Sequence, residues 1–169
     1  IIKKLKLNSW NIEFCGNFVF ISNSKNKKSL KNYLGVEFSI VKKLSYKIFH
    51  FVSSSKYVWN ANWKICVENS IDEYHAPFLH QTTFKKTLKL NPKYYGTKNV
   101  MLVEMPQTEP YIKAIKKINT LFKTENADDN YSHALIFPLS TIASSSGKSF
   151  YLQRYVPLSE NKTLITTEI

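Results

Sequence analysis

Hydrophobic and polar residues follow strand-like patterns over much of the 169-residue chain. Runs of aromatic and β-branched residues that are bounded by polar residues predict strands. These runs lie at 14–22, 45–54, 99–105, 133–143, 150–158 and 162–169. The polar stretch NSKNKKS that follows the first run predicts a loop.

Helical spacing predicts helices in three other places. The run SLKNYLG ends at Gly35, which is a usual helix stop, and YIKAIKKINTLF at 111–122 is amphipathic. A longer helical run, NANWKICVENSIDEYH, occupies 60–75. Because strands and helices do not alternate regularly along the chain, we expect an α+β fold in which one antiparallel sheet holds a helix.

The run that begins at residue 60 carries the candidate chemistry. At about 100° per residue, its apolar side chains fall within a sector roughly 80° wide, which predicts a core-facing stripe. The stripe consists of Trp63, Val67, Ile71, Tyr74 and Phe78. Asn69, Asp72 and His75 form a polar stripe beside it, so Asp72 can reach His75. A carboxylate bonded to one imidazole nitrogen strengthens the other nitrogen as a metal ligand.

A second histidine, His80, follows His75 by five residues. An unbroken helix would turn two such side chains about 140° apart. Pro77 disfavours helical geometry at the residue before it, so we predict that the helix ends or distorts between the two histidines. His80 can then turn back toward His75. The spacing alone also fits two histidines with ordinary hydrogen-bond partners, and the polar stripe alone fits a solvated helix face.

The net charge suggests a nucleic acid or an anionic membrane as a partner, but the scarcity of arginine argues against nucleic acid. The 24 basic and 12 acidic residues give a net charge of +12, which is typical of proteins that bind nucleic acid or anionic membranes. Arg154 is the only arginine, although arginine is the usual residue for bidentate contacts to phosphates and bases. The lysines are spread along the chain in short clusters, so we interpret them as a solvated surface and expect no nucleic-acid partner.

The cysteines and the apolar runs indicate a cellular compartment. Cys15 and Cys66 lie far apart in apolar segments, so we expect buried free thiols in a reducing environment. No apolar run approaches the roughly 20 residues of a membrane span, and there is no signal-peptide pattern. We therefore expect a soluble cytoplasmic protein with no membrane partner. Because the chain begins at Ile1 and stops within a strand-like run, we expect it to be a piece of a longer protein.

Eight positions in the region around the two histidines resemble the signature of a known family. They are Trp63, Lys64, Glu68, Asn69, Asp72, Tyr74, His75 and His80. This pattern is similar to the catalytic domain of Rieske-type non-haem iron oxygenases, the alpha subunits of ring-hydroxylating dioxygenases and their relatives. In outline, 10–24 resembles the last strand of the family's Rieske domain, and 152–169 resembles late strands of the catalytic domain. The resemblance predicts the end of a Rieske domain and a linker at 1–35, and part of a catalytic domain at 36–169.

The resemblance implies a helix-grip (START-like) fold, with an antiparallel sheet around a long helix, truncated at both ends. It also implies a mononuclear Fe(II) site. His75 and His80 correspond to two ligands of a facial triad, whose open positions admit dioxygen and substrate. Asp72 corresponds to the aspartate that carries electrons from a Rieske cluster on the neighbouring subunit. Asn69 corresponds to an asparagine near the iron.

The chain departs from the family's pattern at two points. The family's third iron ligand follows strands such as 162–169, whereas Asp128 and Asp129 precede them, so we assign neither. Neither Cys15 nor Cys66 begins a Cys-x-His or Cys-x-x-His pair, so we expect the [2Fe-2S] cluster in an upstream domain. We expect the isolated chain to bind iron weakly and to turn over nothing.

The resemblance implies a function in which oxygen from O2 is inserted into an aromatic or small amine substrate. Electrons would come from NAD(P)H through a reductase, directly or through a ferredoxin, and the role of Asp72 implies a homo-oligomer such as a trimer. Phe78, Phe84 and Phe137 are candidates for the substrate pocket or for the core. The alternative is a non-catalytic helix-grip protein that binds small molecules or lipids, which would not need the histidine pair.

Overall fold

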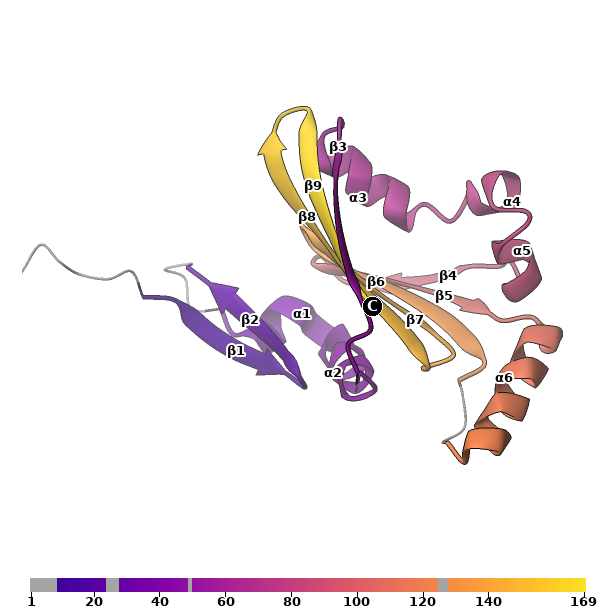
Figure 1. The fold of residues 1–169 in the computed structure, drawn as a ribbon. Coiled ribbons are helices and arrows are strands. Elements are labelled where there is room, and N and C mark those ends of the chain that lie inside the picture. Colours follow the sequence, from indigo (N-terminus) through magenta and orange to yellow (C-terminus); the bar gives the residue numbers. More distant parts are fainter. Residues whose placement is uncertain (1–8, 24–27, 49, 125–127) are drawn as a thin grey trace, which may run out of the picture.

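The main sheet of the computed structural model is antiparallel, and it has seven strands within the described residues 9–23, 28–48, 50–124 and 128–169. The strand order is β3-β9-β8-β7-β6-β5-β4 (Figure 1). The strands are β3 (Ser54–Trp59), β4 (Lys93–Gly96), β5 (Val100–Pro106), β6 (Asn130–Ile136), β7 (Ser140–Ser145), β8 (Ser149–Ser159) and β9 (Lys162–Glu168). The predicted α+β fold with an antiparallel sheet is confirmed.

The remaining elements lie around this sheet. Strands β1 (Asn11–Cys15) and β2 (Phe18–Ser22) form a separate hairpin. The helices are α1 (Leu30–Leu34), α2 (Phe38–Tyr46), α3 (Trp63–Ile71), α4 (Ala76–Leu79), α5 (Phe84–Thr87) and α6 (Glu109–Phe122), with a 3-10 turn at Gly35–Glu37. In the part of the chain that the structure describes, no helix is long and apolar enough to cross a membrane.

The main sheet separates one hydrophobic core from another, because neighbouring residues of a strand point to opposite faces. On β6, Ile136 belongs to the first core and Leu135 to the second. The first core joins the sheet to β1, α1 and α2, and its buried members are Cys15, Leu30, Leu34, Val41, Val100, Ile136 and Ile142. The second joins the sheet to α3 through Cys66, Val67, Leu135, Tyr155 and Ile165. Figure 1 shows the hairpin, α1 and α2 on one side of the sheet and α3 on the other. Both cysteines are free and buried, as predicted.

The predicted strand at 14–22 is a hairpin rather than one strand. Cys15 pairs with Phe18, which leaves Gly16 and Asn17 as a two-residue turn. Gly16 has φ of 63°, a value that glycine adopts without strain, and a Cβ there would collide with the side chain of Ser45. The predicted strand at 133–143 likewise divides into β6 and β7. Residues 24–27 of the predicted loop after β2 lie outside the described residues.

The prediction of a strand at 45–54 is wrong. Helix α2 continues to Tyr46, and β3 begins only at Ser54, while Phe49 lies outside the described residues. Val41 and Leu44 are three residues apart on α2, and both are buried. Burial of this helical face therefore outweighs the strand preference of the neighbouring aromatic residues.

The predicted helix at 60–75 begins near the expected place and ends early. The side chain of Asn62 accepts a hydrogen bond from the N–H of Lys64 and caps the start of α3. The helix ends at Ile71, and Asp72 then accepts a hydrogen bond from the N–H of Tyr74 at 3.0 Å. Such a local turn competes with the helix for the backbone groups.

The helix was predicted to end between His75 and His80, and this position is wrong. The chain leaves the helix at Asp72, before His75, and Pro77 lies in the first turn of the new helix α4, where proline is tolerated. The apolar stripe stops with α3 as well. Trp63, Val67 and Ile71 pack in the second core, whereas Tyr74 and Phe78 are 78% and 64% exposed.

Candidate functional site

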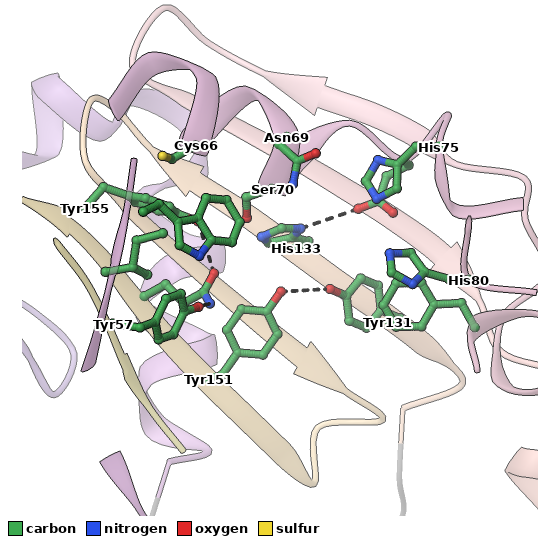
Figure 2. Close-up of a pocket in the computed structure, with 15 residues that line it drawn as sticks. Tyr57, Cys66, Asn69, Ser70, His75, His80, Tyr131, His133, Tyr151 and Tyr155 are labelled. Atoms are coloured by element: carbon green, nitrogen blue, oxygen red, sulfur yellow. Dashed lines mark hydrogen bonds and ion pairs between the residues drawn. The ribbon is translucent and has the colours of Figure 1, made fainter. Parts of the chain in front are cut away.

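A cavity of about 190 Å³ lies between α3 and the face of the sheet that carries the second core (Figure 2). Helix α3 and the segment after it supply one wall, with Cys66, Asn69, Ser70, Glu73, His75 and His80. The sheet supplies the opposite wall from alternate residues of β6 and β8, as a period of two requires. These residues are Tyr131, His133, Tyr151, Gln153 and Tyr155.

The rings of His75 and His80 meet at one end of this cavity (Figure 2). Their centroids are 5.2 Å apart, and their planes are inclined at 66°. His75 precedes α4 and His80 follows it, so the five-residue spacing spans one short helix with both side chains in the same cavity. His80 also packs against Phe84, with 4.9 Å between ring centroids. The structure thus brings the predicted histidine pair together.

Asp72 lies beside His75, at the end of α3. Its Oδ2 is 3.5 Å from Nδ1 of His75, and its side chain is 52% exposed. Nδ1 of His75 is buried and has no hydrogen bond within the described ranges, so its contact with Asp72 is a close approach and not a hydrogen bond. Because Nδ1 faces Asp72, Nε2 is the His75 nitrogen left for a metal. Asn69 also lines the cavity, and Figure 2 shows it between Ser70 and His75.

Two tyrosines of the sheet wall hydrogen-bond to each other. The hydroxyls of Tyr131 on β6 and Tyr151 on β8 are 3.2 Å apart, although β7 runs between the two strands. Ala143 of β7 pairs with Tyr151, and its small side chain leaves room for the two rings to meet. Burial raises the pKa of Tyr131 above its ordinary value and raises the pKa of Tyr151 to about 12. Both hydroxyls therefore stay protonated at neutral pH.

A buried pair of Glu73 and His133 was not predicted from the sequence. Oε1 of Glu73 is 3.4 Å from Nδ1 of His133, and the side chains are 7% and 1% exposed. The strand period gives a signal for His133, because alternation along β6 places it on the same face as Tyr131 and Leu135. A signal exists for Glu73 as well, because it follows Cys66, Asn69 and Ser70 of the same wall at helical spacings of seven, four and three residues.

A family model described as "Ring hydroxylating alpha subunit (catalytic domain)" matches residues 47–169, which include every residue that lines the cavity. The chain belongs to this family. No curated protein matches the chain at a significant level.

Solved structures of Rieske oxygenases share the fold of the chain. The quaternary ammonium Rieske monooxygenase CntA in complex with an inhibitor matches with a TM-score of 0.74 and 14% identity, covering 95% of this chain and 41% of that chain. A naphthalene 1,2-dioxygenase mutant bound to phenanthrene matches with a TM-score of 0.64 and 16% identity, covering 94% and 43%. The chain thus spans about two fifths of the length of these structures.

The possible metal ligands in the cavity are part of a complete set. Imidazole nitrogens are common ligands for iron, and two of them lie together here. Among the residues that the structure describes, no group of three His, Cys, Asp or Glu side chains is arranged to hold a metal. Asp128 and Asp129 form ion pairs with Lys47 and Lys116 instead.

Of the three phenylalanines predicted to lie in the pocket or the core, one lines the cavity and two are exposed. Phe84 lines the cavity. Phe78 and Phe137 are 64% and 50% exposed, so their assignment to the pocket or the core is wrong. Phe78 follows the early end of α3, and Phe137 lies between β6 and β7, where neither the helix nor the strand period applies.

Proposed function

We propose that the chain is part of the catalytic domain of a Rieske non-haem iron oxygenase, in which His75 and His80 hold a mononuclear Fe(II). The observation that supports this best is the meeting of the two rings in the cavity, with Asp72 at Nδ1 of His75. Fe(II) held by two histidines and one carboxylate keeps open positions at which dioxygen is activated to hydroxylate an organic substrate. A carboxylate outside the described residues would complete this set.

The other residues of the site would position the ligands and the substrate. Asp72 would orient the imidazole of His75 from its Nδ1 side, which would leave Nε2 to hold the metal. Asn69 would lie close to the metal, and the aromatic wall of the cavity would exclude water from the substrate. The related structures were solved with L-carnitine and with phenanthrene. For this chain we propose an aromatic or small amine substrate.

We propose further that residues 1–35 are the end of a Rieske domain and its linker. The paired residues Ile12 and Ile21, and Phe14 and Val19, leave an exposed apolar face on the hairpin, which is typical of a surface that packs against another part of a protein. A [2Fe-2S] cluster would lie in that domain. Electrons from NAD(P)H would arrive through a reductase, with or without a ferredoxin, and cross to Asp72 from the neighbouring subunit of a homo-oligomer.

Titration of the full chain, labelled with ¹⁵N in its histidines, with Co²⁺ tests the ligand pair. Co²⁺ is paramagnetic and uses the same kinds of ligand as Fe²⁺. The chain has four histidines, and we expect the ring signals of His75 and His80 to shift most. His50 is exposed and does not line the cavity, so it serves as an internal control. Equal shifts at all four rings, or binding at His50 alone, would contradict the proposal.

Replacement of Asp72 with asparagine is expected to lower turnover of the complete oxygenase by about 10- to 100-fold while the bound iron is retained. The new amide would carry no charge, yet its carbonyl oxygen can still accept the hydrogen bond from Tyr74 that forms the turn. The matched control is Asp129→Asn, because Asp129 forms an exposed ion pair with Lys116 and such pairs contribute little. Turnover and metal content are measured together, and equal losses in both variants would disprove the bridging role.

A further inference from the structure

We infer that His133 accepts a hydrogen bond from the substrate, which therefore carries an O–H or N–H group. This inference rests on the proposed function, because it takes the cavity as the substrate site. His133 lies on β6, on the wall opposite α3. Figure 2 shows it between Ser70 and Asn69 of α3 on one side and the Tyr131–Tyr151 pair on the other.

Glu73 determines which nitrogen of His133 is available. Oε1 of Glu73 is 3.4 Å from Nδ1, and both side chains are more than nine-tenths buried. With the carboxylate accepting the proton of Nδ1, the imidazole is held as one tautomer, and Nε2 carries a lone pair. Nε2 is buried and has no hydrogen-bond partner within the described part of the chain. A buried polar atom normally has a partner, and here a molecule in the cavity can supply it.

The neighbouring hydroxyls do not fill this role. Those of Tyr131 and Tyr151 lie 3.2 Å from each other, and their rings contact His133 edge-on, with centroids 6.2 and 5.9 Å away. The hydroxyl of Tyr155 donates to Oε1 of Gln153 at 3.0 Å. The hydroxyls of Tyr131, Tyr151 and Tyr155 thus each have a partner in the sheet wall, whereas Nε2 of His133 has none among the described residues.

The size and walls of the cavity restrict the substrate further. The cavity measures about 190 Å³, and an apolar cavity of about 150 Å³ is known to hold a benzene molecule. Tyr57, Trp59 and Phe84 add aromatic surface to the walls. A molecule about the size of one ring, with a single donor group, satisfies both the space and the acceptor. A quaternary ammonium group has no N–H and would leave Nε2 without a partner.

Phenol and anisole test the inference, because they share one ring and differ in the hydrogen-bond donor. Each is titrated into the metal-free full chain, and binding is followed by NMR. We expect phenol to bind about 10-fold more tightly than anisole. His133→Leu should remove this preference, and Tyr151→Phe, which deletes a hydroxyl of the same cavity, should keep it. Equal affinities in the native chain, or a preference that survives His133→Leu, would overturn the inference.

A measurement on the native chain covers the case in which His133→Leu does not fold. The ¹⁵N signals of His133 report which ring nitrogen carries the proton. We expect a protonated Nδ1 and an unprotonated Nε2 whose signal shifts when phenol is added. A protonated Nε2, or no shift with phenol, would refute the assignment. The phenol experiments contain no metal, so failure of Co²⁺ to bind at His75 and His80 would not change their result. The inference about His133 and the proposed metal site can therefore fail independently of each other.

Discussion

Replacement of either His75 or His80 with alanine is expected to abolish oxygenase turnover in the complete protein. Each change removes one of two imidazoles whose rings lie 5.2 Å apart, and a single histidine with one carboxylate cannot supply three protein ligands. We expect the mononuclear iron to be lost, while the absorption of the [2Fe-2S] cluster, which we propose to lie in another domain, is kept. Turnover, iron content and the visible spectrum are measured on the same samples.

The matched control for these variants is His50→Ala. His50 is exposed and lies outside the cavity, so its removal should leave iron content and turnover at the native level. The alternative function gives a different result. A helix-grip protein that only binds a small molecule would keep its ligand in both cavity variants, and retention of full activity by His75→Ala would refute the assignment of the ligands.

Replacement of Leu34 with alanine is expected to lower the free energy of unfolding by about 2–5 kcal/mol. Leu34 is fully buried in the first core, where it joins α1 to Cys15 of the hairpin and to the sheet residues Val100 and Ile136. Removal of its side chain loses apolar contacts and leaves a cavity that these elements cannot readily close. Unfolding of the full chain in urea measures the change as a lower midpoint.

The control for this prediction is Leu121→Ala. Leu121 also lies in a helix, α6, but it is 76% exposed, so the same deletion should change the unfolding free energy by no more than about 0.5 kcal/mol. Both variants have the same change of side chain and a helical backbone, and they differ in burial. Equal shifts of the midpoint in the two variants would contradict the role of the first core.

The parts of the fold that the sequence predicts well are those with a complete periodic pattern. The strand at 99–105 is β5 within one residue at each end, and the amphipathic run at 111–122 is α6, which begins two residues earlier. The runs at 150–158 and 162–169 are β8 and β9. In β5, propensity and burial favour the same element, so local information is sufficient. Helix α6 follows its amphipathic spacing, although Asn119 is its one buried residue.

The errors occur where tertiary contacts or a short turn decide the structure. The hairpin at Gly16 needs only two turn residues, so the apolar run around it looks continuous. Helix α2 forms where aromatic residues favour a strand, because Val41 and Leu44 are buried. The end of α3 depends on a hydrogen bond of Asp72 that helical spacing does not reveal.

The same limits apply to the site. The three-residue spacing predicts that Asp72 reaches His75, and Pro77 predicts that His80 turns back toward His75; the structure places these side chains together. Their roles in binding metal and carrying electrons remain predictions. The pairing of Glu73 with His133 joins residues 60 positions apart that come from opposite walls of the cavity. No local pattern contains that information.

The pairing of β3 with β9 has a consequence for the order in which the protein folds during synthesis. Ser54 pairs with Glu168, so β3, which is synthesised early, cannot pair in the sheet until β9 has been synthesised. Helix α3 contacts β8 and β9, and it gains those contacts only after the ribosome has made both strands. Until then, its apolar residues lack the surface that buries them. Such long-range pairing folds slowly and leaves the nascent chain dependent on protection from aggregation.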